Sequence, residues 1–554
     1  MTGAQYIVDS LISRGVTDAF GIPGGVILPL LYEMESRKPL FTPHLSYHEQ
    51  CAGFAACGYA QASGKIGVAY ATRGPGFTNL ITAIADAYYD SLPVLFVTAH
   101  SAPCPPNGMR VMADQEMDTC SMVRNITKKA ARLDDPMSFA DDFEELCETA
   151  LNGRKGPVFL DVSTRVLKQE VHNSTNVIRA VKQQSKSLDA SRIVEALRNA
   201  KRPVILAGDG INQADARGLF REFCEKSNIP VISSRFTHDI LEGSDQYYGY
   251  VGSHGMRCAN FILSKTDLIL SIGNRLHFPP KSESFGEILE HARIIRCEID
   301  EGEFNRNIPN TTIVQADLRD VLCSLCQVED HGNHTEWINV CNILKEELSK
   351  EDMNPAVESI SNILDKIPAY YTISNDVGNN EFWVSRACVA SGIKNRAFYS
   401  KSFGALGCGL GKAIGFYYAT RQPVLSFVGD QGLQMNIQEL QYISQHQLPI
   451  TIVLLNNQSS GMIKDREAIV YNRLVHTSPE SGYRFPDFKV VCEAYGIDYI
   501  SDGTIGKLSQ KKPTFVEIKI DESLSLKPSL PRGYKCDNMQ PSLSVELLRR
   551  LQSL

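Results

Sequence analysis

The sequence predicts an α/β protein made of three successive doubly wound domains, each with a parallel sheet covered by helices on both faces. Short, strongly apolar runs alternate with helical patterns along nearly the whole chain, which is typical of buried parallel strands. A chain of 554 residues is also too long for one hydrophobic core. Polar stretches at 171–187 and 328–354 divide it into three parts of ordinary domain size.

The predicted domains follow one another in sequence. Residues 1–170 contain the strand-like runs IGVAYAT, PVLFVTA and PVFLDV. Residues 188–330 contain PVILAG, PVISS, DLILSIG and ARIIRCEID, and residues 355–535 close with PTFVEIKI. The remaining tail, 536–554, ends in a short amphipathic helix.

Composition excludes several classes of protein. A net charge of -7 without a basic cluster argues against a nucleic-acid partner. No apolar run approaches the roughly 18 residues that span a bilayer, and the first residues lack a signal-peptide pattern, so we expect no membrane partner and a cytoplasmic location. The 15 cysteines are expected to be reduced thiols. Cys323 and Cys326 form a C-x-x-C, which we expect to pack on a helix because no second pair accompanies it.

The third domain carries the most informative pattern, around Asp430 and Asn457. The segment 424–462 predicts strand, tight turn, helix and strand, with each polar residue following a strand. The carboxyl ends of neighbouring parallel strands lie side by side, so the two side chains can converge. Mg²⁺ prefers oxygen ligands, and the free N–H groups of the helix after the turn favour phosphate oxygens. Each residue alone is commonly a turn residue or cap, but the joint spacing predicts a cation and phosphate site.

This spacing resembles the thiamine diphosphate motif, written G-D-G and followed one strand later by N-N. The family has Gly where this chain has Gln431, with Gly432 following. The resemblance implies that Mg²⁺ is held by the side chains of Asp430 and Asn457 and by the Ser459 carbonyl. The further cofactor-binding residues that it implies are Asp376, Gly378, Asn379, Asn380, Gly404, Leu406, Gly429, Gln431, Gly432 and Met462. Among these, Leu406 is also a catalytic candidate, because it matches the bulky residue that bends the cofactor, although it could also be an ordinary core leucine.

The first domain resembles the pyrimidine-binding domain of the same family. The evidence is Glu49 at the start of a helix, GIPGG at 21–25 and RGPGFTN at 73–79. The cofactor needs a carboxylic acid that shares a proton with its aminopyrimidine ring, and Glu49 is the candidate for that catalytic role. Taken alone, an acidic residue in a first turn is also favoured by the helix dipole. The remaining cofactor-binding candidates here are Pro23, Gly24, Gly74 and Asn79.

Two further matches are looser. Gln115 corresponds to a family glutamine near the reacting centre and is a catalytic candidate, and Lys128 corresponds to a lysine near the substrate channel. A helix cap and a surface lysine are the alternatives for these residues.

Over nearly the whole chain, the three units resemble the pyrimidine, central and pyrophosphate domains of the acetolactate synthase family. GSHGM at 252–256, GNR at 273–275, EID at 298–300 and QAD at 315–317 resemble its flavin-binding central domain, so FAD is the further cofactor that the resemblance allows. The family's cofactor lies between two subunits, which implies a homodimer or homotetramer with active sites at the interface.

The resemblance implies decarboxylation of a 2-keto acid, with pyruvate as the expected donor, and transfer of the hydroxyethyl unit to a keto acceptor. The acceptor segments depart from the family: Pro279 stands at an Arg position, Arg466 at a Trp position and Arg73 at a small-residue position. A guanidinium suits an anionic or hydroxyl-rich acceptor, unless it is merely a solvated charge. The alternatives are a carboligase acting on a keto-sugar in surface-polysaccharide synthesis, a simple decarboxylase, a flavin-dependent oxidase and a non-catalytic cofactor-binding relative. Retention of Glu49, Asp430 and Asn457 argues against the last.

Overall fold

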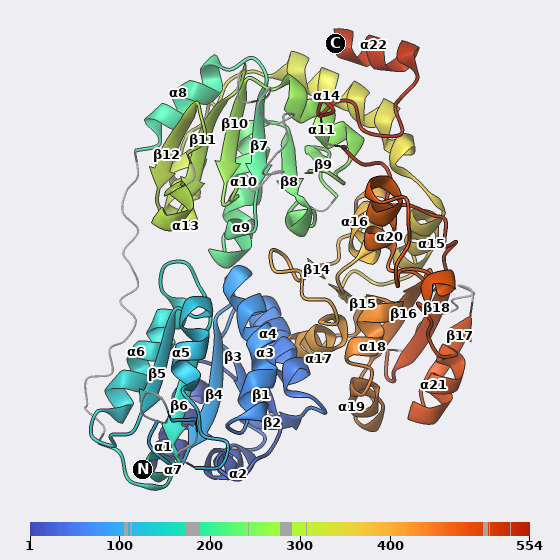
Figure 1. The fold of residues 1–554 in the computed structure, drawn as a ribbon. Coiled ribbons are helices and arrows are strands. Elements are labelled where there is room, and N and C mark those ends of the chain that lie inside the picture. The colour runs from blue at the N-terminus through green and yellow to red at the C-terminus, as the bar shows by residue number, and fades with distance from the viewer. Residues whose placement is uncertain are drawn as a thin grey trace.

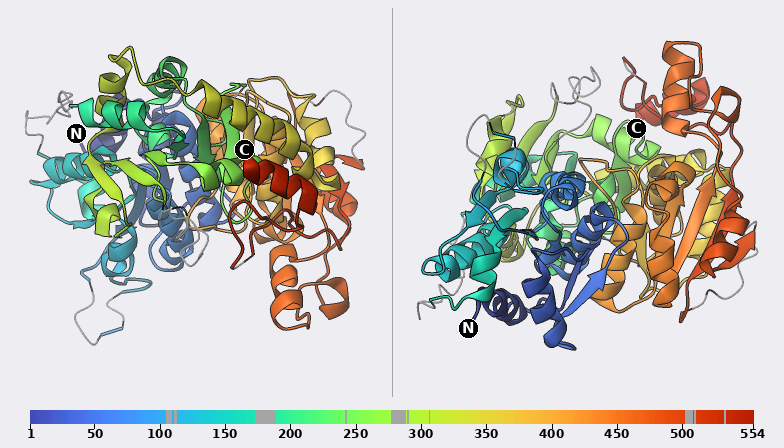
Figure 2. Two further views of the ribbon diagram at one scale, coloured as in Figure 1. Left: turned by 90° about the horizontal axis from the view of Figure 1, so that it is seen from above. Right: turned by 60° about the horizontal axis from the view of Figure 1, so that its bottom comes forward.

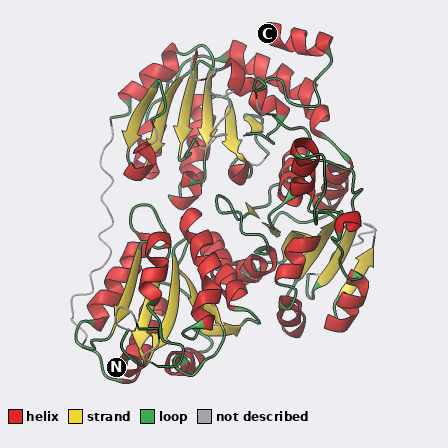
Figure 3. Ribbon diagram, viewed as in Figure 1, coloured by secondary structure: helices red, strands yellow, loops and turns green. Residues whose placement is uncertain are grey.

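The computed structural model describes residues 1–104, 109–110, 113–172, 189–241, 243–276, 288, 291–305, 307–501, 508, 510–531 and 533–554. These residues form three six-stranded sheets with helices on both faces (Figures 1 and 3). The strands of each sheet pair in parallel. The prediction of three successive doubly wound units is confirmed.

The first sheet has the strand order β2-β1-β3-β4-β6-β5. Its strands are β1 (Asp18–Gly21), β2 (Thr42–Leu45), β3 (Gly67–Tyr70), β4 (Val94–His100), β5 (Lys129–Leu133) and β6 (Val158–Ser163). Its helices are α1 (Gly3–Ser13), α2 (Leu28–Ser36), α3 (Glu49–Ser63), α4 (Pro75–Tyr89), α5 (Thr119–Val123), α6 (Phe139–Leu151) and α7 (Thr164–Lys168).

The second sheet has the order β12-β11-β10-β7-β8-β9. Its strands are β7 (Pro203–Ala207), β8 (Val231–Ser234), β9 (Tyr247–Val251), β10 (Leu268–Ile272), β11 (Arg293–Glu298) and β12 (Thr311–Gln315). The helices of this unit are α8 (Ser191–Asn199), α9 (Gly210–Gln213), α10 (Arg217–Ser227), α11 (Arg257–Lys265), α13 (Leu318–Cys326) and α14 (Thr335–Leu348).

The third sheet has the order β14-β13-β15-β16-β18-β17. Its strands are β13 (Thr372–Asn375), β14 (Ala397–Phe398), β15 (Val424–Gly429), β16 (Ile450–Asn456), β17 (Asp498–Ser501) and β18 (Thr514–Lys519). The helices are α15 (Pro355–Leu364), α16 (Asn379–Ala390), α17 (Gly409–Thr420), α18 (Asp430–Met435), α19 (Glu439–Gln445), α20 (Gly461–Val470) and α21 (Phe488–Tyr495), and α22 (Val545–Ser553) follows in the tail.

The first and third units lie side by side, joined by the packing of α3 on α17 (Figures 1 and 2). Glycines allow this close approach. A β-carbon at Gly58 would lie 2.4 Å from the backbone oxygen of Lys412, and one at Gly415 would lie 2.0 Å from that of Ala55. Real β-carbons do not come so close to backbone atoms, so larger side chains at these positions would force the helices apart.

Two segments outside the predicted domains pack on the second unit. The stretch 328–354, expected to mark a boundary, contains α14, whose Trp337 and Leu344 are buried in one core with the tail residues Leu543 and Leu551. The amphipathic helix expected in the tail is α22, and Figure 1 shows it beside α14. The predicted linker falls almost entirely outside the described residues. Cys323 and Cys326 lie on α13, as expected.

Among the residues described, no helix combines the length and the apolar character that a membrane crossing requires.

Candidate active site

Asp430 lies where β15 gives way to α18, next to the end of β16. The two strands pair in parallel, with Gly429 opposite Leu455. The Asp430 carboxylate is buried, and its Oδ1 accepts hydrogen bonds from the Gln431 backbone (2.8 Å) and the Tyr483 hydroxyl (2.9 Å). Burial raises the pKa of Asp430 to about 6, while these donors act in the opposite direction. Gln431 stands where the family motif has Gly, but it causes no backbone strain, because this residue lies inside α18.

Several polar atoms around this turn are buried without a hydrogen-bond partner. They are Asp376 Oδ2, Asn379 Oδ1 and Nδ2, Asp430 Oδ2 and Ser459 Oγ. Leaving such an atom unpaired costs about 1–3 kcal/mol, so a group of them at one place indicates a ligand. The set is rich in oxygen, as a Mg²⁺ site requires. A β-carbon at Gly432 would lie 2.6 Å from Asp376 Oδ2, which explains the glycine in the turn.

The neighbouring candidates complete this half-site. Asn457 is buried just beyond β16, with its Oδ1 near the Ser459 backbone nitrogen (3.4 Å). Asn380, in the first turn of α16, donates its side-chain amide to the Asp376 carbonyl (2.7 Å), and Gly378 precedes that helix with a φ of 126°. Met462 is partly exposed on α20.

The loop around Leu406 lies beside the same half-site. Leu406 is partly exposed, whereas its neighbours Ala405 and Gly407 are buried, so it is not an ordinary core leucine. Gly404 and Gly407 adopt φ values of 66° and 89°, which only glycine tolerates well. The Gly407 N–H donates to Asp376 Oδ1 (2.9 Å), which connects this loop to the buried, unpaired polar atoms around the Asp430 turn.

A second half-site lies on the first unit, around Glu49. Glu49 is the first residue of α3, and its Oε2 accepts a hydrogen bond from the Asn79 amide (2.9 Å). The loop containing Pro23 and Gly24 packs against the residues after β3, with Gly24 too close to Thr72 for a β-carbon. A β-carbon at Gly74 would lie 2.7 Å from the β-carbon of Gln115. The structure therefore brings Glu49, Asn79, Gly24, Gly74 and Gln115 to the carboxyl edge of the first sheet, whereas Lys128 precedes β5 at the other edge.

The remaining predicted residues lie as follows. Arg73 forms an ion pair with the buried Glu116 and also donates to Ser101, so it is not a free solvated charge. Lys128 lies on the wall of a central cavity and donates to the Asn152 carbonyl (2.7 Å). Arg466 is exposed on α20. Pro279 lies outside the described residues.

Glu49 and Asp430 belong to different units of the chain, on α3 and α18. Across the described residues, no hydrogen bond or ion pair joins Glu49 to Asp430 or Asp376. The two half-sites are nevertheless anchored to each other by a residue that sequence reasoning missed. Glu439, at the start of α19, accepts hydrogen bonds through Oε1 from the backbone N–H groups of Tyr47 (2.8 Å) and His48 (3.1 Å), directly before Glu49.

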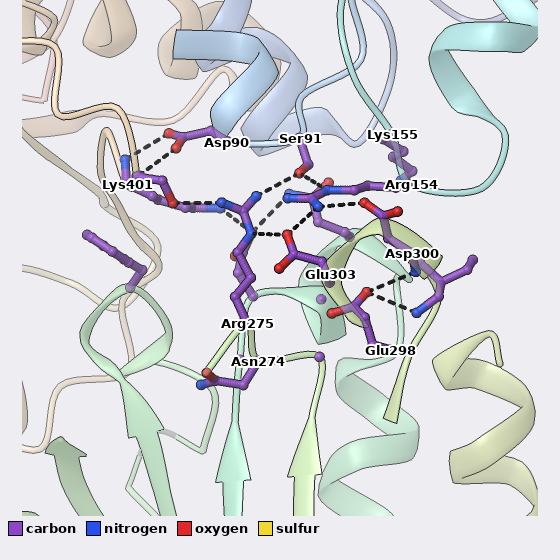
Figure 4. Close-up of a pocket in the computed structure, with 18 of the residues that line it drawn as sticks. Asp90, Ser91, Arg154, Lys155, Asn274, Arg275, Glu298, Asp300, Glu303 and Lys401 are labelled. Carbon is purple, nitrogen blue, oxygen red and sulfur yellow. Dashed lines mark hydrogen bonds and ion pairs between the residues drawn. The ribbon is translucent and has the colours of Figure 1, made fainter. Parts of the chain in front are cut away.

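A cavity of about 2320 Å³ lies between the three units, at the carboxyl ends of β7, β10 and β11 (Figure 4). Doubly wound sheets bind nucleotides at this edge. Most of the residues in the four flavin-like motifs line it, including Asn274, Glu298 and Asp300. Figure 4 shows Arg154 of the first unit reaching Asp300 and Glu303 of the second, with Arg275 beside Glu303.

The chemistry of the cavity wall fits a dinucleotide. Glu298, Asp300 and Asp317 lie at the ends of adjacent strands, where carboxylates bind ribose hydroxyls in such folds. Arg154 and Arg275 pair with Asp300 and Glu303, so their guanidinium groups would bind phosphate oxygens by exchanging those partners. On the opposite wall, His254 Nδ1 is buried without a partner, and burial lowers the pKa of His254 to about 4, which keeps the ring neutral.

Comparison with known proteins agrees with this geometry. Three family models match in order: "Thiamine pyrophosphate enzyme, N-terminal TPP binding domain" over residues 1–122, the central domain over 190–325, and the "C-terminal TPP binding domain" over 376–521. The fold and site are those of a thiamine diphosphate-dependent enzyme.

Relatives narrow the class. The chain is 30% identical to the acetolactate synthase isozyme 2 large subunit of Escherichia coli K12, covering 98% of this chain and 100% of that protein. It is 31% identical to the acetolactate synthase large subunit of Lactococcus lactis (97% and 96% covered) and 30% identical to a probable one of Methanocaldococcus jannaschii (99% and 96% covered). The chain belongs to the acetolactate synthase family.

Proposed function

We propose that this protein is a carboligase that decarboxylates a 2-keto acid, with pyruvate as donor, and joins the two-carbon unit to a keto acceptor. The observation that carries the proposal is the set of buried, unpaired polar atoms around Asp430 and Asp376. Most of these atoms are oxygens, so a cation with an anionic ligand would satisfy them. The Glu49–Asn79 pair on the first unit supports it, since an activating acid must be held in one orientation.

Thiamine diphosphate, when bound, supplies the carbanion chemistry that releases carbon dioxide from the keto acid. Asp430, Asn457 and the Ser459 carbonyl would hold Mg²⁺, and the turn at Gln431 and Gly432 would contact the diphosphate.

The chain's own side chains would orient the reaction. The Glu49 carboxyl would hold a proton against the ring nitrogen of the aminopyrimidine, and the Asn79 amide would fix the direction of that carboxyl. Leu406 would contact the cofactor and help to set its conformation, and Gln115 would lie at the reacting centre.

The active unit would be at least a dimer. In the family that this chain resembles the cofactor lies between two subunits, so one copy would bring its Glu49 to the Asp430 of the other. Sedimentation analysis tests this directly: a monomer that is fully active at assay concentration would contradict it.

The acceptor side supports a second candidate. Arg466 is exposed on α20, four residues after Met462 and so on the same face of the helix. A guanidinium there would favour an anionic or hydroxyl-rich acceptor, such as a keto-sugar, over a second pyruvate. Arg73 does not add to this argument, because Glu116 already neutralises it.

The central cavity would hold FAD. Its carboxylates, its arginines and the unpartnered His254 match the ribose, diphosphate and ring polar groups of a dinucleotide. Purified protein should show flavin absorption near 450 nm that is released on denaturation. Colourless protein whose melting temperature does not respond to added FAD would contradict this assignment.

The test of function is carbon NMR of labelled pyruvate with protein, thiamine diphosphate and Mg²⁺. Acetolactate would support pyruvate as acceptor, whereas slow acetaldehyde alone, converted to a new product by an added keto-sugar, would support the second candidate. Glu49→Gln should reduce turnover at least about a hundredfold, as loss of a general acid–base group does. Glu35→Gln, exposed on α2, is the control. Unchanged turnover in Glu49→Gln would refute the role of Glu49.

A further inference from the structure

A cluster of charged residues is completely buried between the first and third units. Lys412 on α17 places its Nζ 2.8 Å from Asp86 Oδ2 and 3.7 Å from Asp90 Oδ2, both on or just after α4, and all three side chains are inaccessible to solvent. Nζ also donates to the Tyr399 carbonyl (3.3 Å). Burial alone would lower the pKa of Lys412, but the two carboxylates outweigh it and raise that pKa, so the lysine is charged.

The two carboxylates hold the segment 399–405 of the third unit. The Ser400 hydroxyl donates to Asp86 Oδ1 and accepts the Ala405 N–H (3.0 Å). Asp90 accepts the backbone N–H groups of Lys401 (2.8 Å) and Ser402 (2.9 Å). Lys401 in turn pairs with Asp209 on the central cavity, and Figure 4 shows Lys401 next to Asp90.

This segment leads directly into Leu406. On the near side, the Ala405 N–H is bound by Ser400; on the far side, Gly407 donates to Asp376 (2.9 Å), and its carbonyl accepts from Asn436 (2.9 Å). Both peptide neighbours of Leu406 are therefore fixed, although Leu406 itself is partly exposed. The near anchor leads to Asp86 in the Lys412 cluster, whereas the far anchor is the separate buried carboxylate of Asp376.

We propose that Lys412 and Ser400 are positioning residues: Lys412 fixes Asp86 and Asp90, and Ser400 transmits that anchor to the loop that presents Leu406 to the cofactor. The proposal rests on the role of Leu406 in the proposed function. A buried ion pair is weak evidence for stability, because desolvation offsets the attraction, whereas a fixed geometry is what such a cluster can provide.

Ser400→Ala gives the cleanest test, because it removes one hydroxyl and keeps every charge. Its affinity for thiamine diphosphate, measured with Mg²⁺ by calorimetry, should fall about tenfold, and kcat should fall while KM for pyruvate is unchanged. Ser400→Thr, which keeps the hydroxyl, should recover both values. Thr420→Val removes a hydroxyl at the other end of α17, bonded to the Phe416 carbonyl, and should behave as wild type.

Wild-type affinity in Ser400→Ala, or equal losses in Ser400→Ala and Ser400→Thr, would overturn the proposal. Lys412→Met leaves two carboxylates buried without their cation. Its failure to fold would agree with both a structural and a positioning role of the cluster. The serine variants keep every charge, so they decide between these two roles. If the wild-type protein binds thiamine diphosphate but does not convert pyruvate, the proposed function fails, while the binding measurements still test the positioning role.

Discussion

Replacing Glu439 with Gln should change how the stability of the protein depends on pH. Burial raises the pKa of Glu439 from 4.5 to about 7, although the N–H groups of Tyr47 and His48 oppose the shift. A folded state that holds its proton more tightly than the unfolded chain loses stability as the pH rises from 4.5 through about 7. The difference corresponds to about 3 kcal/mol, since one pKa unit is worth about 1.4 kcal/mol.

The assay is thermal unfolding between pH 5 and pH 8. For a chain of this length unfolding cooperatively, about 3 kcal/mol corresponds to about 3 °C in melting temperature. Glu439→Gln keeps a carbonyl for both backbone donors but cannot titrate, so its melting temperature should rise relative to wild type by about this amount across the range. Glu493→Gln, exposed on α21, should parallel wild type. Parallel curves for Glu439→Gln and wild type would refute the raised pKa.

Three further outcomes follow from contacts in the structure. Tyr483→Phe removes the hydroxyl that orients Asp430, so Mg²⁺ binding should weaken about tenfold. The assay is a Mg²⁺ titration with thiamine diphosphate present, and an unchanged titration would contradict this prediction. Gly415→Val places a β-carbon 2.0 Å from a backbone oxygen of α3, so it should lower the free energy of unfolding by at least about 3 kcal/mol. Thermal unfolding measures this loss, and a melting temperature equal to wild type would disprove the close packing. Arg73→Ala strands the buried Glu116 and should cost about 3 kcal/mol, most of which the double variant with Glu116→Gln should recover, whereas simple additivity would argue against the pair.

Buried strands were predictable because their signal is local. The runs at β3, β4 and β6 are apolar at nearly every position, as strands covered on both faces must be. Edge strands were less visible. β12 is mostly exposed and has no such run, and β17 is exposed at both ends. These two strands have too few buried positions to stand out.

The sequence by itself determined the half-sites. Asp430 and Asn457 each follow one of two strands that pair in parallel, and successive strands of such a sheet are often neighbours. The same logic placed Glu49 at the start of a helix after a short strand.

Only the tertiary structure decided what holds those residues in place. Glu439 contacts the backbone before Glu49 across nearly four hundred residues of sequence, and Lys412 meets Asp86 from another unit. A single lysine in the apolar stretch of α17 was a visible signal, but its partners were not. Their identity depends on how two helices pack, and that packing is set by the combined shape of both surfaces and not by any local pattern in the chain.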